Sequence, residues 1–389
     1  MSGARPTVAH LVTPYLFLTG SWVHAQIVHN RRHRPVVMTQ GTENLDVFPL
    51  DPVYDFSAGR AGARRIAFAV AKYLLGRFPA APYVDAARRE RVRLLHAHQG
   101  WEGARTAHLR RALGIPHVTS FYGRDASMLP RKAYWRALYR RLFREGDLFL
   151  AEGSHSARVL VAIGCPEEKV RVIHLGVDPE RIPFRERRAA PGEEIVGLIA
   201  ASFREKKGIG DALDAFARAA ARRRDLRLRL RVIGDGPLRP RIEARVSAGD
   251  LAGKVDLLGY QPFPRYLEEL ARAHFLLSPS VTAADGDCEG GAPVCLLDAQ
   301  AAGLPILGTT HCDIPEVTVP ERSAFLVPER DVSALAGALE RFLAAPERWG
   351  EMGRAGRAHV EQAFDIRKQA EKLADLYDEL RSAAERGRE

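Results

Sequence analysis

Short strand-like runs of apolar residues alternate along the chain with longer helix-like segments. In the first half, the apolar runs that predict buried strands are Thr7–Val12, Arg34–Thr39, Val92–His98, His117–Phe121, Leu148–Ala151 and Val170–Leu175. Helical segments are predicted between the later strands, as over Glu102–Leu113 and Arg131–Phe143. Strands that alternate with helices predict a parallel sheet covered on both faces.

The same alternation starts again in the second half. The predicted strands there are Ile195–Ala200, Leu228–Ile233, Val255–Leu258, Phe275–Pro279 and Pro305–Gly308. The predicted helices are Ile209–Arg222, Ala292–Ala302 and an amphipathic tail over Glu347–Arg388. Two restarting patterns indicate two doubly wound α/β domains, which bind ligands beyond the carboxyl ends of their strands.

The length of 389 residues agrees with two domains, because a single core stops growing near 250–300 residues. We expect an N-terminal domain over 1–180 and a linker over 181–193, where charged residues, proline and alanine are frequent. A second domain is expected over 194–364. Residues 365–389 are expected to form a helix that packs back on the first domain.

Composition narrows the class of protein. Apolar residues make up 46% and charged residues 27%, as in soluble globular proteins. No apolar run reaches the roughly 18 residues that a bilayer span needs. His10 and Pro14 interrupt the first apolar run, and no small-residue cleavage site follows it, so we expect no signal peptide. The four cysteines lack zinc-ligand spacing, and we expect them to be reduced thiols in a cytoplasmic protein.

The positive charge is concentrated in the first half. Residues 1–180 hold 26 Lys and Arg against 15 Asp and Glu, whereas the remainder holds 32 against 33. An anionic partner such as phospholipid headgroups, a lipid-diphosphate acceptor or nucleic acid would explain this, and so would an arginine-rich composition without functional meaning. The segment Arg60–Arg93 mixes apolar and basic residues, so peripheral contact with the inner face of the plasma membrane stays an alternative. No recognition motif favours nucleic acid, and we expect no nucleic acid partner.

Two common nucleotide-binding loops are missing. After Val12 the chain continues Thr13-Pro14-Tyr15 without the G-x-G-x-x-G turn of a dehydrogenase, and no G-x-x-x-x-G-K-[ST] loop occurs. Asp285-Gly286-Asp287 matches the D-x-D of metal-using glycosyltransferases. Its place late in the second domain, within an acidic, glycine-rich loop, favours a solvated turn instead.

The segment from Glu289 to Ile306 has features of a diphosphate site. Its glycines let the backbone approach a ligand closely, and Pro293 is expected in the first turn of the following helix. The free N–H groups at that helix start suit a diphosphate. Asp298 is expected to face the same crevice, and Gly303 is expected to end the helix.

This segment resembles the E-G-x-P-x-x-x-x-E-A-x-A-x-G-x-P-V signature of the family 4 retaining glycosyltransferases. Other parts resemble that family in the same order along most of the chain: His96–His98 (I-H-A-H), Pro116–Asp125 (P-x-V-x-T-x-H-G-x-D), Gly164–Asp178 (G-x-P-x-x-K-x-x-V-I-x-N-G-V-D), Ala201–Gly208 (G-R-L-x-x-K-K-G), Val232–Pro237 (V-I-G-D-G-P), Leu258–Tyr260 (F-L-G) and Ile314–Glu316 (G-G-x-x-E).

The resemblance implies a GT-B fold, with two Rossmann-like domains facing each other across a cleft. The first would bind the acceptor and the second the nucleotide sugar. It implies a retaining transferase that moves a hexosyl unit from a UDP- or GDP-sugar to a glycan, lipid-linked or natural-product acceptor by front-face displacement. No cofactor and no metal is expected, because cations and backbone amides would neutralise the diphosphate. A nucleotide-sugar epimerase of the same fold and a two-lobed binding protein without catalysis are the alternatives.

Residue by residue, the resemblance assigns catalytic roles to Arg204, Lys207 and Glu289. The residues assigned to substrate binding are Ser202, Gly234, Gly259, Tyr260, Gly290, Gly291, Ala292, Pro293, Val294, Asp298, Tyr122, Asp125 and Trp22. The chain departs from the family where Tyr122 replaces a histidine and Ser202 an arginine. The two acidic residues, Glu289 and Asp298, are nine positions apart instead of eight, and the second is Asp rather than Glu.

Overall fold

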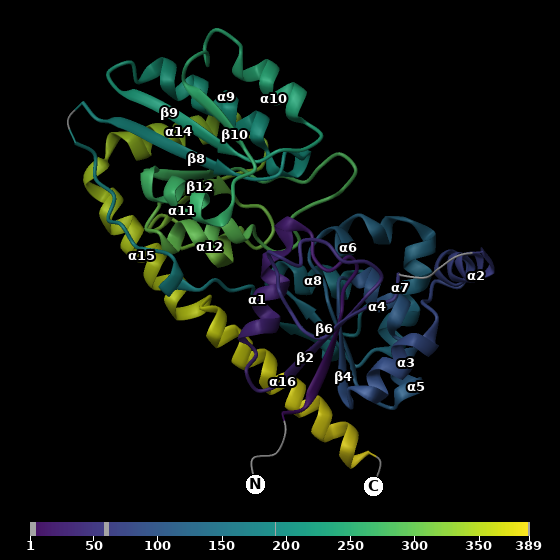
Figure 1. Cartoon of the computed structure of the whole chain (residues 1–389). Helices are drawn as coiled ribbons and strands as arrows, with labels where there is room; N and C mark the ends of the chain where they lie inside the picture. The colour runs from purple at the N-terminus through teal and green to yellow at the C-terminus, as the bar shows by residue number, and fades with distance from the viewer. Residues whose placement is uncertain (1–4, 58–61, 191, 388–389) are drawn as a thin grey trace. The chain divides into compact units, whose positions relative to one another are not determined.

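The computed structural model describes residues 5–57, 62–190 and 192–387, and these divide into two compact units (Figure 1). The first unit contains the described residues up to Gly176 together with those from Ile366 onward, and the second runs from Val177 to Asp365. Residues 181–193, expected as a linker, group with the second unit. Arg60 and Arg388, the ends of two predicted segments, lie outside the described residues.

The first unit contains a parallel sheet with the strand order β3-β2-β1-β4-β5-β6-β7. Its strands are β1 (Thr7–Leu11), β2 (Arg34–Thr39), β3 (Val53–Asp55), β4 (Val92–His98), β5 (His117–Ser120), β6 (Leu148–Ala151) and β7 (Val170–Val172). Strands such as β1 and β6 are buried at every position, which explains why they are continuous apolar runs in the sequence. Strand order reverses between β1 and β4, as in a doubly wound fold.

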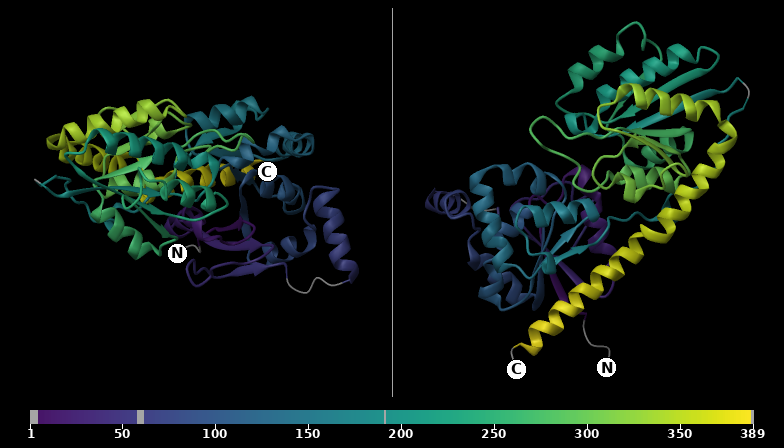
Figure 2. Two further views of the ribbon diagram at one scale, coloured as in Figure 1. Left: turned by 90° about the horizontal axis from the view of Figure 1, so that it is seen from above. Right: turned by 180° about the vertical axis from the view of Figure 1, so that it is seen from behind.

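Helices lie on both faces of this sheet (Figure 2). They are α1 (Ser21–His29), α2 (Gly62–Tyr73), α3 (Ala80–Arg89), α4 (Gly100–Thr106), α5 (Leu109–Leu113), α6 (Arg124–Ser127), α7 (Ala133–Glu145), α8 (Ser154–Ala162) and α16 (Ile366–Arg386). Leu373 and Tyr377 of α16 pack against Val8, Leu94 and other buried strand residues, so the chain's last helix completes the core of the first unit.

The second unit contains a parallel sheet with the order β10-β9-β8-β11-β12-β13. Its strands are β8 (Glu194–Ala200), β9 (Arg227–Ile233), β10 (Val255–Gly259), β11 (Phe275–Ser278), β12 (Ile306–Thr309) and β13 (Ala324–Val327). Its helices are α9 (Ile209–Arg222), α10 (Arg239–Val246), α11 (Phe263–Arg272), α12 (Val294–Ala301), α13 (Ile314–Val317), α14 (Val332–Ala344) and α15 (Trp349–Ala363). Two separate apolar clusters, one around Phe216 and Phe342 and one around Leu296 and Phe364, form its core.

Four predicted helices differ in the structure, and one of them, predicted over Arg131–Phe143, spans Ala133–Glu145 as α7. The predicted Glu102–Leu113 helix is two helices, α4 and α5, because the Thr106 hydroxyl bonds the Glu102 carbonyl one turn back and weakens the regular helix there. The predicted tail is also two helices, α15 and α16, separated at Phe364 and Asp365. The predicted Ala292–Ala302 helix begins only at Val294, since Pro293 is its extended N-cap residue with ψ 129°. Gly303 follows with φ +86°, as a helix-ending glycine should.

None of the described helices is both long and apolar enough to cross a bilayer.

Candidate functional site

The candidate donor site of the second unit lies where its strand order reverses, between β8 and β11. The segment Ala201–Gly208 follows β8, and the segment Pro279–Pro293 follows β11. Because β8 and β11 are parallel neighbours, both segments leave the same edge of the sheet. This edge is where doubly wound sheets bind their ligands.

A buried ion pair joins these two segments. Lys207 Nζ lies 2.8 Å from Glu289 Oε2, and the two side chains are 17% and 6% exposed. Ser280 Oγ donates to the other carboxylate oxygen, Glu289 Oε1, at 2.8 Å. Burial alone would lower the pKa of Lys207, but the Glu289 carboxylate raises it. Burial likewise opposes ionisation of Glu289, but the two lysines beside it lower its pKa, so both groups are charged at neutral pH.

The other cations of the first segment differ in their partners. Lys206 Nζ donates to the Cys288 carbonyl at 2.9 Å and lies 3.2 Å from Asp287 Oδ1, so it fastens the acidic loop. Asp285 Oδ1 accepts the Asp287 N–H at 2.9 Å, which makes the D-x-D sequence a local turn. Arg204 is exposed, and its guanidinium has no hydrogen-bond or ion-pair partner among the described residues.

Two glycines hold the backbone at this edge in close packing. A Cβ on Gly208, where φ is +61°, would lie 1.9 Å from the Pro279 carbonyl oxygen. A Cβ on Gly234, where φ is +138°, would lie 1.9 Å from the Ala201 carbonyl oxygen. Any side chain there would push apart the strand ends that carry the candidate residues.

The neighbouring candidates Ser202, Gly259 and Tyr260 also lie at this edge. The Gly234 N–H donates to the Gly259 carbonyl at 2.9 Å, which ties the ends of β9 and β10. Tyr260 is exposed, and its hydroxyl donates to the Asp235 carbonyl at 3.1 Å. Ser202 is half-buried after β8.

The segment Gly290–Val294, which includes Gly291, Ala292 and Pro293, leads directly from Glu289 into α12. Asp298 lies on α12, and Tyr266 donates its hydroxyl to Asp298 Oδ2 at 3.2 Å. Burial raises the pKa of Asp298 to about 7, despite the opposing Tyr266 hydrogen bond. Its carboxyl group can therefore change charge near neutral pH.

In the first unit, a chain of hydrogen-bonded side chains runs through Tyr122. His98 Nδ1 lies 2.8 Å from the Tyr122 hydroxyl, and His98 Nε2 lies 3.1 Å from His10 Nδ1. The Tyr122 hydroxyl also donates to Gln26 Oε1 at 3.3 Å. Burial, with a smaller effect of His33, lowers the pKa of His10 to about 3, and burial lowers that of His98 well below its usual value, so both rings are neutral.

Asp125 contacts Tyr122 through a hydrogen bond, and Trp22 contacts it through its ring. Asp125 Oδ1 accepts the Tyr122 N–H at 2.9 Å and Oδ2 accepts the Gly100 N–H at 2.7 Å, so this carboxylate fixes the turns after β4 and β5. The Trp22 ring stands edge-on to Tyr122 with ring centroids 6.0 Å apart. The Trp22 indole N–H is buried and has no hydrogen-bond partner among the described residues.

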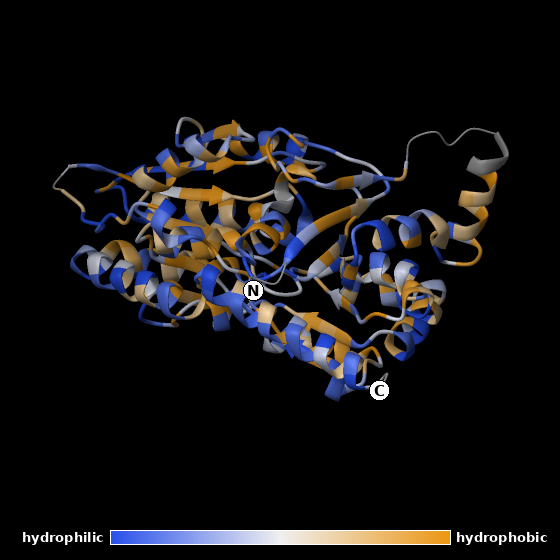
Figure 3. Cartoon of the chain, turned by 60° about the horizontal axis from the view of Figure 1, so that its bottom comes forward, coloured by the Kyte–Doolittle hydropathy of each residue, from blue (hydrophilic) through white to orange (hydrophobic). Residues whose placement is uncertain are grey.

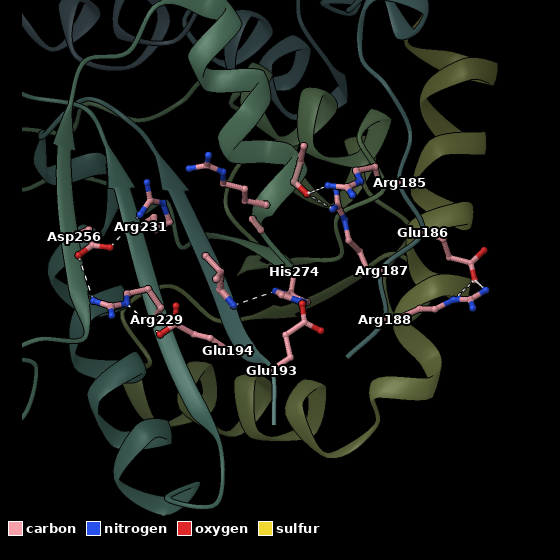
Figure 4. Close-up of a pocket in the computed structure, with 14 residues that line it drawn as sticks. Arg185, Glu186, Arg187, Arg188, Glu193, Glu194, Arg229, Arg231, Asp256 and His274 are labelled. Carbon is pink, nitrogen blue, oxygen red and sulfur yellow. Dashed lines mark hydrogen bonds and ion pairs between the residues drawn. The ribbon is translucent and has the colours of Figure 1, made fainter. Parts of the chain in front are cut away.

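A cavity of about 690 Å³ lies at the amino ends of the second unit's strands, near His274 and Arg187 (Figure 4). Its charges are largely paired within the protein. Arg231 pairs with Asp256 at 3.1 Å, and Arg187 donates to the carbonyls of Leu270, Ala271 and Ala302. Because ligands of doubly wound sheets bind at the carboxyl ends, we do not assign the donor to this cavity.

Four residues that contact the candidate site residues carry no motif in the sequence. Ser280, Tyr266 and Gln26 carry no motif, and only the folded chain brings them to Glu289, Asp298 and Tyr122. His10 lies 88 positions before His98, and the pair could have been found only from the prediction that β1 and β4 are neighbours.

The fold and the site define a GT-B type protein, and comparisons with known proteins name the family. The profile described as "Glycosyl transferases group 1" matches residues 194–345, and the one described as "Glycosyltransferase Family 4" matches residues 25–181. The chain therefore belongs to the group 1, family 4 glycosyltransferases, and the predicted fold class and family are confirmed.

Relatives with assigned names agree with this family. The chain is 36% identical over 249 residues to the putative colanic acid biosynthesis glycosyltransferase WcaL of Salmonella typhimurium. The match spans 63% of this chain and 60% of WcaL. It is 34% identical over 288 residues to the amylovoran biosynthesis glycosyltransferase AmsK of Erwinia amylovora, covering 73% of this chain and 69% of AmsK. The Anabaena protein HepE, solved with UDP and glucose, superimposes with a TM-score of 0.77 over 96% of this chain and 100% of HepE at 16% identity, a likeness of fold alone.

Proposed function

We propose that this protein is a retaining glycosyltransferase that moves a hexosyl unit from a UDP- or GDP-sugar to a glycan or lipid-linked acceptor in exopolysaccharide assembly. The buried Lys207–Glu289 pair at the carboxyl edge of the second unit is the observation that supports this best. It places a cation and a hydrogen-bond acceptor side by side next to the start of α12. The names of WcaL and AmsK support a polysaccharide product.

In this proposal the site acts by stabilising charge. As the glycosidic bond to the donor sugar loosens, negative charge grows on the leaving diphosphate. Lys207 and Arg204 balance that charge, together with the N–H groups at the start of α12. Glu289 accepts hydrogen bonds from the sugar hydroxyls, and Asp298 accepts them from the ribose. Side chains and the helix terminus supply the positive charge, so the reaction needs no metal ion on the diphosphate.

Nucleotide binding is the first test. Thermal unfolding would be recorded without added divalent cation in the presence of UDP, GDP, ADP or NAD. A nucleotide at about 100 times its Kd stabilises the protein by about 2.7 kcal/mol, which raises the unfolding midpoint by a few degrees. A shift with UDP or GDP supports the proposal. A shift with NAD alone would refute it.

Transfer is the second test. Radiolabelled UDP- or GDP-sugars would be incubated with lipid extracts that contain lipid-linked glycans, and the anomeric configuration of the product would be read by NMR. An epimerase would convert the donor sugar without any acceptor, and a binding protein would produce neither change. An inverted product would refute front-face retention.

We also propose that the first unit contacts an anionic membrane through α2 and the residues after it. Ile66, Val70, Tyr73, Leu74 and Leu75 are exposed there, and apolar residues of α2 are visible in Figure 3. Residues 1–180 also carry the positive charge of the chain, and a basic amphipathic helix suits an anionic bilayer surface. Sedimentation with phosphatidylglycerol vesicles but not with phosphatidylcholine vesicles is expected, and it should be lost in Leu74→Glu. Equal binding to both vesicles would refute charge recognition.

A further inference from the structure

Two cysteines and one histidine far apart in the sequence converge beside the candidate donor site. One sulfur or nitrogen atom from each of Cys288, His311 and Cys312 lies within 4.8 Å of the corresponding atoms of the other two. Cys288 and His311 are buried, and Cys312 is half-buried. The sheet explains this meeting, because β11 and β12 are parallel neighbours and the loops after them leave the same edge.

The contacts within the cluster are short. Cys312 Sγ lies 3.1 Å from His311 Nε2, and the Cys288 sulfur lies within 4.8 Å of both atoms. In a tetrahedral zinc site with Zn–S near 2.3 Å and Zn–N near 2.0–2.1 Å, ligand atoms lie about 3.3–3.8 Å apart. The three side chains therefore need only small movements to surround one metal ion.

The orientation of the imidazole also fits a metal ligand. His311 Nδ1 lies 2.6 Å from Glu329 Oε1, and an ordinary neutral imidazole donates its N–H to such a carboxylate. The lone pair is then on Nε2, the nitrogen that faces the cysteines. Glu329 is itself fixed, because its Oε2 accepts the Thr282 N–H at 2.7 Å. A carboxylate that orients a histidine in this way is a regular partner of zinc sites.

We propose that Cys288, His311 and Cys312 form a zinc site, with a solvent molecule as the fourth ligand. Thiolate and imidazole donors favour Zn²⁺ over Mg²⁺ or Mn²⁺, which prefer oxygen ligands. Binding replaces the two thiol protons with the metal ion and releases both protons to solvent. The ion would join the loop that carries Glu289 to the loop after β12. This role is separate from the charge neutralisation assigned to Lys207 and Arg204.

Two further contacts support a bracing role. The Asp313 N–H donates to the Gly291 carbonyl at 3.1 Å, and the Glu289 N–H donates to His311 Nε2 at 3.2 Å, a hydrogen bond that a metal ion on Nε2 would replace. These contacts already join the two loops on either side of the cluster. Cys312 has φ +47°, a backbone conformation that non-glycine residues rarely adopt and that the surrounding contacts must hold. A metal–sulfur bond would supply such a contact.

The test uses the full chain and reads metal content rather than turnover. The protein would be purified with a reducing agent and without chelator, its zinc measured by elemental analysis, and Co²⁺ then titrated into metal-depleted protein. One zinc per chain is expected, together with the thiolate-to-cobalt absorption bands of a tetrahedral site. Cys312→Ser should lose both signals. Cys165→Ala, which removes a buried thiol of the first unit, should keep both.

A second variant keeps the proposal testable if Cys312→Ser does not fold. Glu329→Gln leaves all three ligands in place and should weaken zinc affinity about 10–100-fold. A chain with less than a tenth of an equivalent of zinc and no thiolate–cobalt bands would overturn the proposal. So would a peptide map under non-reducing conditions that shows a Cys288–Cys312 disulfide instead. Neither result depends on glycosyl transfer, so failure here is distinct from failure of the proposed function.

Discussion

Breaking the Lys207–Glu289 pair is the sharpest test of the donor site. In Lys207→Met the Glu289 carboxylate, 6% exposed, loses its ion-pair partner and keeps the hydrogen bond from the Ser280 hydroxyl. Removing one partner of a buried ion pair costs about 3–5 kcal/mol of unfolding free energy. We expect about 3 kcal/mol, the lower end, because the remaining hydroxyl still solvates the charge. The double variant Lys207→Met/Glu289→Gln carries no unpaired charge and should recover about 2 kcal/mol of that loss.

Urea unfolding followed by circular dichroism measures these free energies, and steady-state kinetics measures the catalytic consequence. Loss of one charge-stabilising group typically lowers kcat about 10²–10³-fold, and the double variant should not recover it. Arg222→Met removes one side of an exposed pair with Glu340 at 2.8 Å in the same unit, and it should cost at most about 1 kcal/mol. A cost below about 1 kcal/mol for Lys207→Met, or no recovery of stability in the double variant, would refute the argument that a buried pair organises this site.

Three further predictions concern other parts of the candidate sites. Burial raises the pKa of Asp298 to about 7, and ribose hydroxyls should bind the charged form of its carboxyl group. Calorimetry should therefore show UDP affinity falling up to about tenfold per pH unit below pH 7, more steeply than in Asp298→Asn. Parallel pH profiles of the two proteins would contradict this. Gly208→Ala should lower nucleotide affinity and the unfolding midpoint because its Cβ would lie 1.9 Å from the Pro279 carbonyl oxygen, whereas Gly210→Ala, with open space around its Cβ, should lower neither. Asp125→Ala should destabilise the first unit by about 1–3 kcal/mol in urea unfolding, since two backbone N–H groups lose their acceptor, and an unchanged midpoint would contradict this.

The three strands that sequence predicts to the residue are mostly buried. Arg34–Thr39, Val92–His98 and Leu148–Ala151 agree with β2, β4 and β6 residue by residue, because parallel strands buried on both faces are continuous apolar runs. Val53–Asp55 was not predicted as a strand. It lies at the sheet edge and its three residues are only half-buried, so it lacks that signal.

Helix ends were harder to predict because they depend on single contacts. The break after Thr106 results from one hydroxyl that bonds a carbonyl, and the late start of α12 results from the extended backbone of Pro293. Neither contact changes the pattern of apolar residues. Sequence therefore predicts that a helix exists more reliably than where it ends.

For the candidate site, too, sequence predicts which residues matter better than it predicts their contacts. Motif spacing could nominate Lys207 and Glu289, but their contact across 82 positions depends on which strands are neighbours. The spacing of Cys288 and Cys312 matches no short zinc motif, so sequence favoured four unconnected thiols. Ligands on loops after adjacent parallel strands need no fixed spacing along the chain, because the sheet itself sets the distance between them.

The partners of the three cations indicate how the site would respond to a nucleotide. Lys206 is held by the acidic loop and Lys207 by Glu289, so neither can move to a ligand without breaking a bond inside the protein. Arg204 is exposed and unpartnered among the described side chains, and it can turn to a diphosphate at little cost. If the proposed donor site is correct, diffusional capture of the anion depends on Arg204, whereas the fixed position of Lys207 suits charge that appears only as the sugar departs. On this reasoning Arg204→Ala raises KM more than it lowers kcat, and Lys207→Met does the reverse. Equal effects of both substitutions on KM and kcat would show that the two cations act as one group.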